Sequence, residues 1–458
     1  MALKTAVVIG GSIAGLLAAA VLSESFDEVL IVDRDELPID IESSQIARRG
    51  VPQSNQIHKL LPLGKERIET ILPGFDDELI ALGCESHDEA ARFTQYINGG
   101  WGVRANSDLI TTYFRRPVFE WVMRRRVLAL DNVTAVKAFA IGLVSSADRS
   151  AVVGVRIKNK PDLQADLVVD ASGRGSKSPN WIEDLSYTPP QVAELRAYMG
   201  YATFTVELPP GLLPEGLQGA ASVATPNLPK GGTIQPCGNG LHTVAAYGIM
   251  RNYPPGDLDG VIQFLEEGAS PLVAEWVKNS RLVGDIETYT MTGNQRRLWE
   301  EMPRRPEGLV VLGDAVTSFN PIYGQGMTMA AVGATILREA VNESGGTVEG
   351  IATRVQKELA PWADTAFSMA AGSDSAFEGV EFVNIAPPSA HSRETSRVLN
   401  ELRSEDVEVF LAMKTAAAYL DPSFLDTESI RTKVAGWKAS GRTINSAYTN
   451  PRIVPPAP

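Results

Sequence analysis

The chain is poor in cysteine and has no long unbroken apolar run. Its 458 residues include only two cysteines, Cys84 and Cys237, which excludes a disulfide framework and favours a reducing, cytoplasmic compartment. Cys84 and His87 are spaced for one face of a helix, but two ligands do not make a zinc site, so no metal is predicted. The most apolar segment, residues 6–22, is broken by glycines and falls short of the ~20 apolar residues that span a bilayer. We therefore expect neither a signal peptide nor a membrane span.

The chain also has fewer basic than acidic residues. The 42 lysines and arginines are outnumbered by 55 aspartates and glutamates, which gives a net charge of −13. An acidic surface repels polyanions, so no nucleic-acid partner is expected. The triplet Arg124-Arg125-Arg126 lies in a helical pattern, where we predict a solvated face instead of a binding patch.

The chain opens with a strand, a glycine-rich turn, a helix and a second strand, all before Asp33. Valine and isoleucine dominate Thr5–Ile9 and Glu28–Val32, as in strands that are buried on both faces. Residues 13–22 carry alanine and leucine at helical spacing. This order predicts one βαβ unit.

The turn in this unit has the composition of a dinucleotide-binding loop. Residues 10–15 read G-G-S-I-A-G, which fits G-x-G-x-x-G with serine at the second glycine position. Such residues allow a tight turn, close approach of a pyrophosphate and close helix packing. The helix N-terminus adds free N–H groups and a positive dipole, and a terminal acid such as Asp33 can bind ribose hydroxyls. The predicted cofactor contacts here are Gly10, Ser12, Ile13, Ala14, Gly15, Asp33 and Arg34. The motif does not distinguish NAD from FAD.

Two later segments repeat the pattern of a hydrophobic strand that enters a glycine-rich turn. Residues 167–176 read L-V-V-D-A-S-G-R-G-S, and residues 309–315 read L-V-V-L-G-D-A before Pro321, Gly324 and Gly326. The last segment resembles the G-D-A…P…G-x-G motif of FAD-dependent aromatic hydroxylases, squalene epoxidases and related monooxygenases. The resemblance implies FAD as the cofactor, with Asp314 on the ribityl chain. It also implies that N–H groups around Gly326 and Met327 face the carbonyl edge of the flavin ring. Val136, Pro321 and Gly324 complete the predicted cofactor contacts.

A narrower resemblance comes from three segments. Residues 49–58 (R-G-V-P-Q-S-N-Q-I-H), 116–120 (R-P-V-F-E) and 320–327 (N-P-I-Y-G-Q-G-M) look like the branch that contains bacterial polyether-type alkene epoxidases. That branch often has two histidines at alternate positions in the first segment, and here the earlier one is Gln56. For His58 we therefore favour a loop hydrogen bond over a catalytic role. For Arg116 we favour contact with FAD over a salt bridge to Glu120 one helical turn on.

The resemblance implies an α/β fold: a Rossmann-like FAD-binding domain of the glutathione-reductase type, interleaved with an antiparallel-sheet substrate domain. We assign residues 1–75, 105–185 and 290–385 to the FAD-binding domain, and residues 76–104 and 186–289 to the substrate domain. Residues 386–458 form a mostly helical region with a mobile tail from Asn450. The candidate walls of the substrate pocket are aromatic: Tyr96, Trp101, Tyr201, Phe204, Tyr247 and Phe319.

The implied reaction inserts one oxygen atom from dioxygen into an electron-rich, apolar substrate through a flavin hydroperoxide. Alkene epoxidation is favoured over aromatic-ring hydroxylation. The flavin carries the chemistry, so no catalytic side chain is predicted. No second glycine-rich fingerprint for NAD(P)H appears, so reduction must come from NAD(P)H directly or through a separate flavin reductase. A flavin-dependent isoprenoid reductase and a non-catalytic escort protein remain alternatives, whereas the W-x-W-x-I-P segment of flavin-dependent halogenases is missing from the chain.

Overall fold

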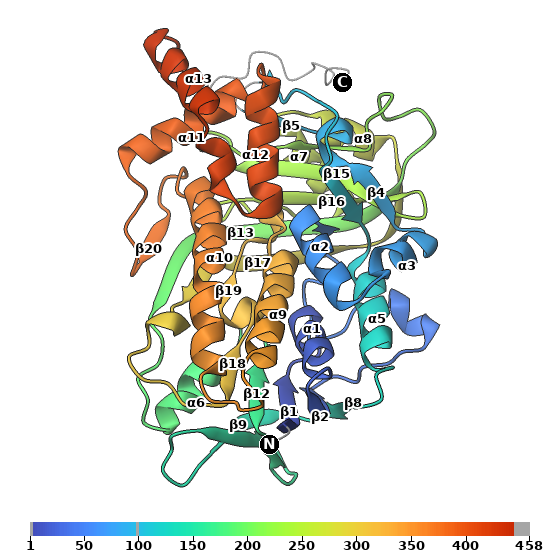
Figure 1. Cartoon of the computed structure of the whole chain (residues 1–458). Helices are drawn as coiled ribbons and strands as arrows, with labels where there is room; N and C mark the ends of the chain where they lie inside the picture. The colour runs from blue at the N-terminus through green and yellow to red at the C-terminus, as the bar shows by residue number, and fades with distance from the viewer. Residues whose placement is uncertain (1–2, 98–99, 444–458) are drawn as a thin grey trace.

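The computed structural model describes residues 3–97 and 100–443. A parallel sheet of five strands forms its lower half in Figure 1, in the order β18-β12-β1-β2-β8. The strands are β1 (Leu3–Ile9), β2 (Phe26–Asp33), β8 (Val133–Lys137), β12 (Leu167–Asp170) and β18 (Leu309–Val311). The three glycine-rich turns that the sequence predicts therefore follow three adjacent strands, β1, β12 and β18. The predicted tail from Asn450 lies outside the described residues.

Helices pack on this sheet and on one another. Helix α1 (Ile13–Leu22) contacts α9 (Gly326–Asn342) and α5 (Arg116–Val127), and α9 contacts α10 (Ile351–Asp374). These helices lie side by side in Figure 1. Nine residues of α1 are buried, because the helix is enclosed between strands β1 and β2 and helix α9. Its small, apolar composition suits that position on every face.

A larger sheet of nine strands forms the upper half of the molecule in Figure 1. Its main path runs β19-β17-β13-β16-β15-β14-β5-β6, with β20 paired to β13, and all neighbours are antiparallel except β14 and β5. Helices α7 (Leu258–Glu266) and α8 (Leu272–Lys278) pack against it. The strands are β5 (Phe93–Ile97), β6 (Gly100–Trp101), β13 (Val192–Glu207), β14 (Gly219–Ser222), β15 (Lys230–Gly238), β16 (Leu241–Gly248), β17 (Arg281–Arg297), β19 (Thr317–Ser318) and β20 (Glu381–Val383).

Strand β17 connects the two halves. It runs without a break through the expected domain boundary between residues 289 and 290, and its end pairs with β19 through Arg296 and Thr317. β19 follows the short 3-10 turn Gly313–Ala315 that ends β18. The large sheet is thus continuous with the segment that carries the G-D-A motif.

Two small sheets and several short helices complete the core. Strands β9 (Ala140–Ser145), β10 (Val152–Ile157) and β11 (Leu163–Gln164) form one sheet, and β3 (Lys59–Leu60), β4 (Glu85–Asp88) and β7 (Ile110–Tyr113) form the other. The remaining helices of this part are α2 (Pro62–Ile71), α3 (Phe75–Ala81), α4 (Glu89–Arg92) and α6 (Ser178–Asp184). The parallel sheet, the largely antiparallel sheet and a helical C-terminal region agree with the predicted fold class.

The C-terminal helices are α11 (Ala390–Leu402), α12 (Val407–Tyr419) and α13 (Glu428–Ala439). A buried ion pair joins α12 to the rest of the chain. Lys414 on α12 and Lys59 on β3 both donate to Oε1 of Glu89, at 2.9 and 2.8 Å. Both ammonium groups also lie over the ring of Phe93. We call these four residues the Glu89 latch.

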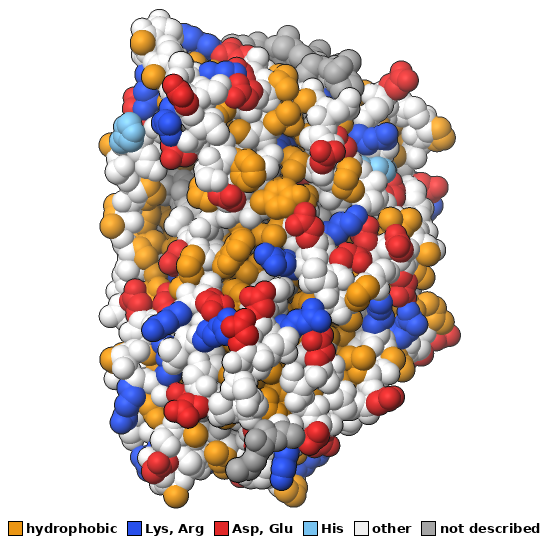
Figure 2. Space-filling model, in the orientation of Figure 1, with side chains coloured by type: hydrophobic (Ala, Val, Ile, Leu, Met, Phe, Trp, Pro, Cys, Tyr) orange, Lys and Arg blue, Asp and Glu red, His pale blue; other side chains and the backbone are white. Residues whose placement is uncertain are grey.

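The face of the molecule seen in Figure 1 carries mixed charge. Figure 2 shows acidic and basic side chains interspersed over it. Within the described part of the chain, none of the helices has the length and apolar character that crossing a bilayer requires.

Candidate functional site

The turn between β1 and α1 requires two of its glycines. Gly10 has a φ of +105°, and a Cβ there would lie 2.5 Å from the carbonyl oxygen of Ala171 at the end of β12. A Cβ on Gly15 would lie 1.7 Å from the carbonyl oxygen of Gly10, so only glycine lets the helix pack this close to the turn. Ser12 precedes α1, but its side chain does not cap the helix. The N–H groups of Ile13 and Ala14, which have no partner within the helix, are left for a ligand.

The predicted ribose ligand, Asp33, is tied to this turn. Its carboxylate accepts hydrogen bonds from the backbone N–H of Gly11 (2.6 Å) and of Asp35 (2.8 Å). Arg34 is exposed, and Val136 is half-buried at the end of the neighbouring strand β8. A hollow with an empty volume of about 320 Å³ opens between the ends of β2 and β8. Its lining consists of Asp35, Glu36, Leu37, Ala135, Val136 and Lys137.

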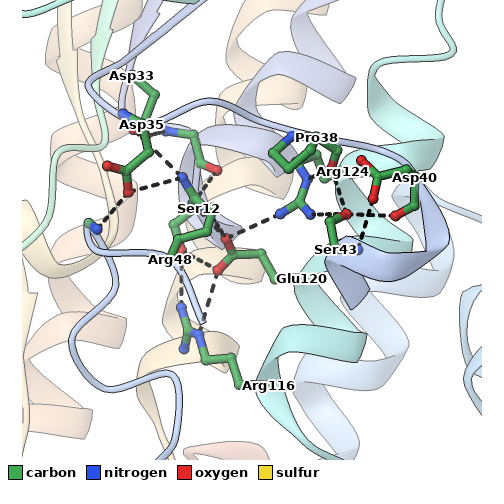
Figure 3. Close-up of polar contacts among 12 residues, drawn as sticks. Ser12, Asp33, Asp35, Pro38, Asp40, Ser43, Arg48, Arg116, Glu120 and Arg124 are labelled. Carbon is green, nitrogen blue, oxygen red and sulfur yellow. Dashed lines mark hydrogen bonds and ion pairs between the residues drawn. The ribbon is translucent and has the colours of Figure 1, made fainter. Parts of the chain in front are cut away.

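Beside the turn lies a group of buried and half-buried polar side chains that we call the Glu120 cluster (Figure 3): Ser12, Arg48, Arg116, Glu120 and Arg124. Arg48 Nε donates to Glu120 Oε1 at 2.7 Å, and its Nη2 donates to the carbonyl oxygen of Gly11 at 2.8 Å. Ser12 Oγ donates to Glu120 Oε2 and accepts from Arg116 Nη2, both at 3.0 Å. Burial opposes the charge of Arg48, but Glu120, Asp33 and Asp35 raise the pKa of its guanidinium above the usual value.

One prediction about this helix is wrong. Arg124 was expected on a solvated face, but its side chain is only 3% exposed. Its Nε donates to the carbonyl oxygen of Pro38 at 2.5 Å, and its Nη1 lies 3.8 Å from Glu120 Oε1. The segment that follows β2 folds over α5 at this point, and the resulting burial lowers the pKa of Arg124 to about 10.

Arg116 lies at the N-terminal turn, and its charge also acts on Asp314 in the late glycine-rich segment. It bonds to Ser12, and its Nε lies 3.7 Å from Glu120 Oε2, so the salt bridge weighed as the alternative exists. Burial lowers the pKa of its guanidinium, while Glu120 and Asp314 act to raise it. A contact with FAD is therefore compatible with the ion pair.

The neighbour of Arg116, His58, is neutral. Its Nδ1 lies 2.7 Å from the carbonyl oxygen of Gln56 and its Nε2 lies 3.5 Å from Arg116 Nη1. A carbonyl only accepts, so the proton must be on Nδ1. Burial, reinforced by the charge of Arg116, lowers the pKa of His58 to about 3. Gln56, which replaces the expected histidine, accepts a hydrogen bond from Thr203 Oγ1 at 2.6 Å. These contacts fit the loop role that we favoured for His58.

The Asp314 carboxylate is half-buried at the turn after β18. No hydrogen bond or ion pair holds it within the described part of the chain. Burial raises its pKa, against the opposing charges of Arg116, Arg174 and Arg297. Arg174 donates to the carbonyl oxygen of Gly293 and to Ser318 Oγ, both at 2.7 Å, and Arg297 donates to the carbonyl oxygen of Ala315 at 3.0 Å. Two arginines that sequence reasoning missed therefore shape the surroundings of this carboxylate.

The start of α9 lies next to Asp314. A Cβ on Gly326 would be 3.7 Å from Asp314 Oδ1, and Gly324 has a φ of +66°. The preceding Pro321 is half-buried and Met327 is buried. Gln325 does not cap the helix, and its buried Oε1 has no hydrogen-bond partner among the described residues.

The N-terminal turn and the late segment converge. A Cβ on Gly313 would lie 2.8 Å from the Cβ of Ala14, and α1 packs against α9. The site thus contains the start of α1, the guanidinium of Arg116, the unpaired carboxylate of Asp314 and the start of α9. These donors and acceptors fit an elongated dinucleotide such as FAD, with its pyrophosphate at α1 and its flavin ring at α9.

The aromatic residues that we expected around the substrate fall into two groups. Alternate residues of a strand point to opposite faces, so Tyr201 and Phe204 on β13 diverge. Tyr201, Tyr247 and Phe319 belong to the core that also contains Met327. The other group, Tyr96, Trp101 and Phe204, belongs to the core under α7 and α8. Only the first group shares a core with the predicted flavin segment.

Tyr289, which the sequence did not single out, joins the first group. Tyr201 pairs with Tyr289 on β17 and with Tyr247 on β16, and the ring centroids are 6.4 and 6.3 Å apart. Thr203 and Thr205 continue the same face of β13. There they line a cavity with an empty volume of about 620 Å³, together with Gln56 and Pro117.

Comparison with known proteins supports this description of the fold. The family model for squalene epoxidase matches residues 244–358. Protein Rv3254 of Mycobacterium tuberculosis is 29% identical over 359 residues, which cover 75% of this chain and 74% of the relative. The flavin-dependent brominase Bmp2 has a similar structure, with a TM-score of 0.65 and 13% identity over 95% of this chain and 99% of Bmp2. PqsL of Pseudomonas aeruginosa, described as a probable FAD-dependent monooxygenase, has a TM-score of 0.60 and 18% identity over 82% of this chain and 96% of PqsL. The chain therefore shares its fold with these flavoproteins, and its residues 244–358 are similar to the squalene epoxidase family.

Proposed function

We propose that the chain is an FAD-dependent monooxygenase that inserts one oxygen atom from dioxygen into an electron-rich, apolar small molecule, by alkene epoxidation. The observation that carries this proposal is the convergence of the α1 turn and the α9 start around the unpaired carboxylate of Asp314. The match to squalene epoxidase favours an alkene as the group that accepts oxygen. FAD, when bound and reduced, supplies the activation of dioxygen.

Different residues would bind the different parts of FAD. The N–H groups of Ile13 and Ala14 would bind the pyrophosphate, the small side chain of Ser12 would let it approach the backbone, and Arg116 would be its counter-charge. Asp33, Arg34 and Val136 would contact the adenosine end, beside the hollow between β2 and β8. Asp314 would accept hydrogen bonds from the ribityl hydroxyls, and the N–H groups of Gly326 and Met327 would face the ring carbonyls. Negative charge on the reduced ring would then be stabilised by the positive end of α9.

The substrate would lie between this site and the large sheet. In this proposal Tyr201, Tyr247 and Phe319 would face the flavin and would exclude water from the reacting atoms. The cavity lined by Thr203, Thr205 and Gln56 lies on the same sheet face and offers a route inward. Tyr96 and Trp101 have a packing role in this proposal, because they share a core with α7 and α8. Phe204 shares that core and also lines the cavity.

Aromatic-ring hydroxylation is the second candidate. The tyrosine row on β16, β13 and β17 offers a broad aromatic surface, and planar rings stack on such surfaces in offset or edge-on geometry. Halogenation is not proposed, although Bmp2 is named a brominase, because the chain lacks the W-x-W-x-I-P segment. The reductant in either case would be NAD(P)H, acting directly or through a separate flavin reductase.

An isotope experiment tests the reaction. Purified protein is reduced with NADH, NADPH or an added flavin reductase, and polyene and phenol substrates are supplied under ¹⁸O₂. We expect a product that is heavier by one labelled oxygen atom, with an epoxide from polyenes. Label that comes from water instead of dioxygen contradicts the monooxygenase assignment. Labelled phenols with no epoxide would favour the second candidate.

A further inference from the structure

Helix α10 ends in a buried carboxylate that has no cationic partner. Asp374 is fully buried, and among the described residues no lysine, arginine or histidine forms an ion pair with it. Its Oδ2 accepts hydrogen bonds from Asn294 Nδ2 (2.7 Å) and from the side-chain amide of Asn320, and its Oδ1 accepts one from the hydroxyl of Tyr323. Buried carboxylates are normally neutralised by a cation or a metal ion, so this arrangement calls for an explanation.

The three donors come from the segment that leads to α9. Asn320 and Tyr323 lie in and next to the 3-10 turn Pro321–Tyr323. Asn294 on β17 also accepts a hydrogen bond from the backbone N–H of Asn320 at 2.8 Å. Asp374 is therefore the point at which α10, β17 and the turn before α9 are joined.

The surroundings disfavour the ionised form of this carboxylate. It stands at the C-terminal end of a helix, where the dipole repels negative charge. Burial raises its pKa to about 6, and the three donors oppose that increase. The titratable groups that face it are Tyr201 on β13, Tyr247 on β16 and Tyr323 in the turn, and none of them carries a positive charge.

Protonation would rearrange one hydrogen bond. Oδ2 already accepts from two amides, so a proton would go to Oδ1, which faces Tyr323. The hydroxyl of Tyr323 would then have to turn and accept instead of donate, because a protonated carboxyl oxygen donates. The turn before α9 would lose a charge-assisted hydrogen bond, which is stronger than a neutral one.

We propose that Asp374 is a positioning residue for the flavin site, and that its charge state decides how firmly residues 320–326 are held against the flavin ring. The inference rests on the proposed function, because it assumes that the start of α9 faces FAD. It makes the affinity for FAD pH-dependent through a residue that does not itself touch the cofactor.

The test measures FAD binding to purified protein from pH 5 to pH 8, by fluorescence quenching and by the visible spectrum of bound flavin. In the unmodified protein we expect the dissociation constant for FAD to be about fivefold larger at pH 5 than at pH 8, a change that corresponds to the loss of one hydrogen bond. Asp374→Asn should remove the pH dependence. Asp364→Asn, on the exposed side of the same helix, should leave it unchanged. Tyr323→Phe removes one donor to the carboxylate, so it should move the inflection to higher pH.

The outcomes separate the two proposals. If the unmodified protein binds no FAD at any pH, the proposed function fails and this inference fails with it. If FAD binds with a dissociation constant that does not vary between pH 5 and pH 8, only the inference about Asp374 is overturned. An inflection that Tyr323→Phe leaves at the same pH also overturns it, even if Asp374→Asn does not fold.

Discussion

The charge of Glu120 should hold the cluster beside the α1 turn together, and Glu120→Gln tests this directly. The carboxylate is 4% exposed and lies 2.5 Å from Arg48, 3.7 Å from Arg116 and 3.8 Å from Arg124. Glutamine keeps the shape and one acceptor but removes the charge. Breaking a buried ion pair by removing one partner costs roughly 3–5 kcal/mol. Arg48 still has Asp33 and Asp35 nearby, so we expect the lower end, a loss of about 3 kcal/mol.

A second ion pair of helix α5, between Arg125 and Glu78 on α3, provides the control. Arg125 pairs with Glu78, but these side chains are 42% and 26% exposed. Glu78→Gln should therefore cost no more than about 1 kcal/mol, and added salt should weaken that effect through screening. Urea unfolding of flavin-free protein, followed by tryptophan fluorescence, gives the free energy of unfolding for each variant. A loss for Glu120→Gln no larger than that for Glu78→Gln would refute the reasoning.

Two further predictions concern the cofactor site and pH. The valine side chain of Gly15→Val cannot fit against the carbonyl oxygen of Gly10, and Asp314→Ala removes the unpaired carboxylate, so both variants should purify without flavin and be colourless. The control Gly436→Ala lies in open space on α13 and should stay yellow. A yellow Gly15→Val protein would contradict the cofactor site. The pKa of Asp374 is about 6 in the folded protein against 3.8 for an ordinary aspartate, so its contribution to stability is complete below pH 3.8 and is lost as the pH rises through 6. We expect the free energy of unfolding to fall by about 3 kcal/mol over that range and Asp374→Asn to flatten this part of the urea-unfolding profile; an unchanged profile would contradict the assignment.

The parts of the fold that local chemistry determines could be predicted from the sequence. Helix α1 begins and ends at the predicted residues, Ile13 and Leu22, because the turn glycines and the spacing of small apolar residues are both local signals. The three glycine-rich turns were recognised for the same reason. Their convergence in the structure agrees with the rule that parallel strands present their carboxyl ends at one edge of a sheet.

The parts that depend on tertiary contacts were missed. Arg124, Arg125 and Arg126 look alike in the sequence, and only the path of residues 38–43 across α5 makes the first of them buried. Asp374 lies at the end of α10, and its donors are 51 to 80 residues away in the sequence, so no local pattern could reveal them. Tyr201 and Phe204 are three residues apart in one predicted strand, so their side chains must point to opposite faces of the sheet. The sequence did not reveal which of these faces meets the flavin segment.

The Glu89 latch has a consequence for dividing this protein into parts. The carboxylate of Glu89 is shared by Lys59 and by Lys414, which lie in different halves of the chain. A fragment that stops at residue 385 would lose Lys414 and uncover the ring of Phe93, while the nucleotide-binding segments stayed complete. The C-terminal helices therefore contribute to the packing around Glu89 and Phe93, and a fragment without them should be less stable than the full chain.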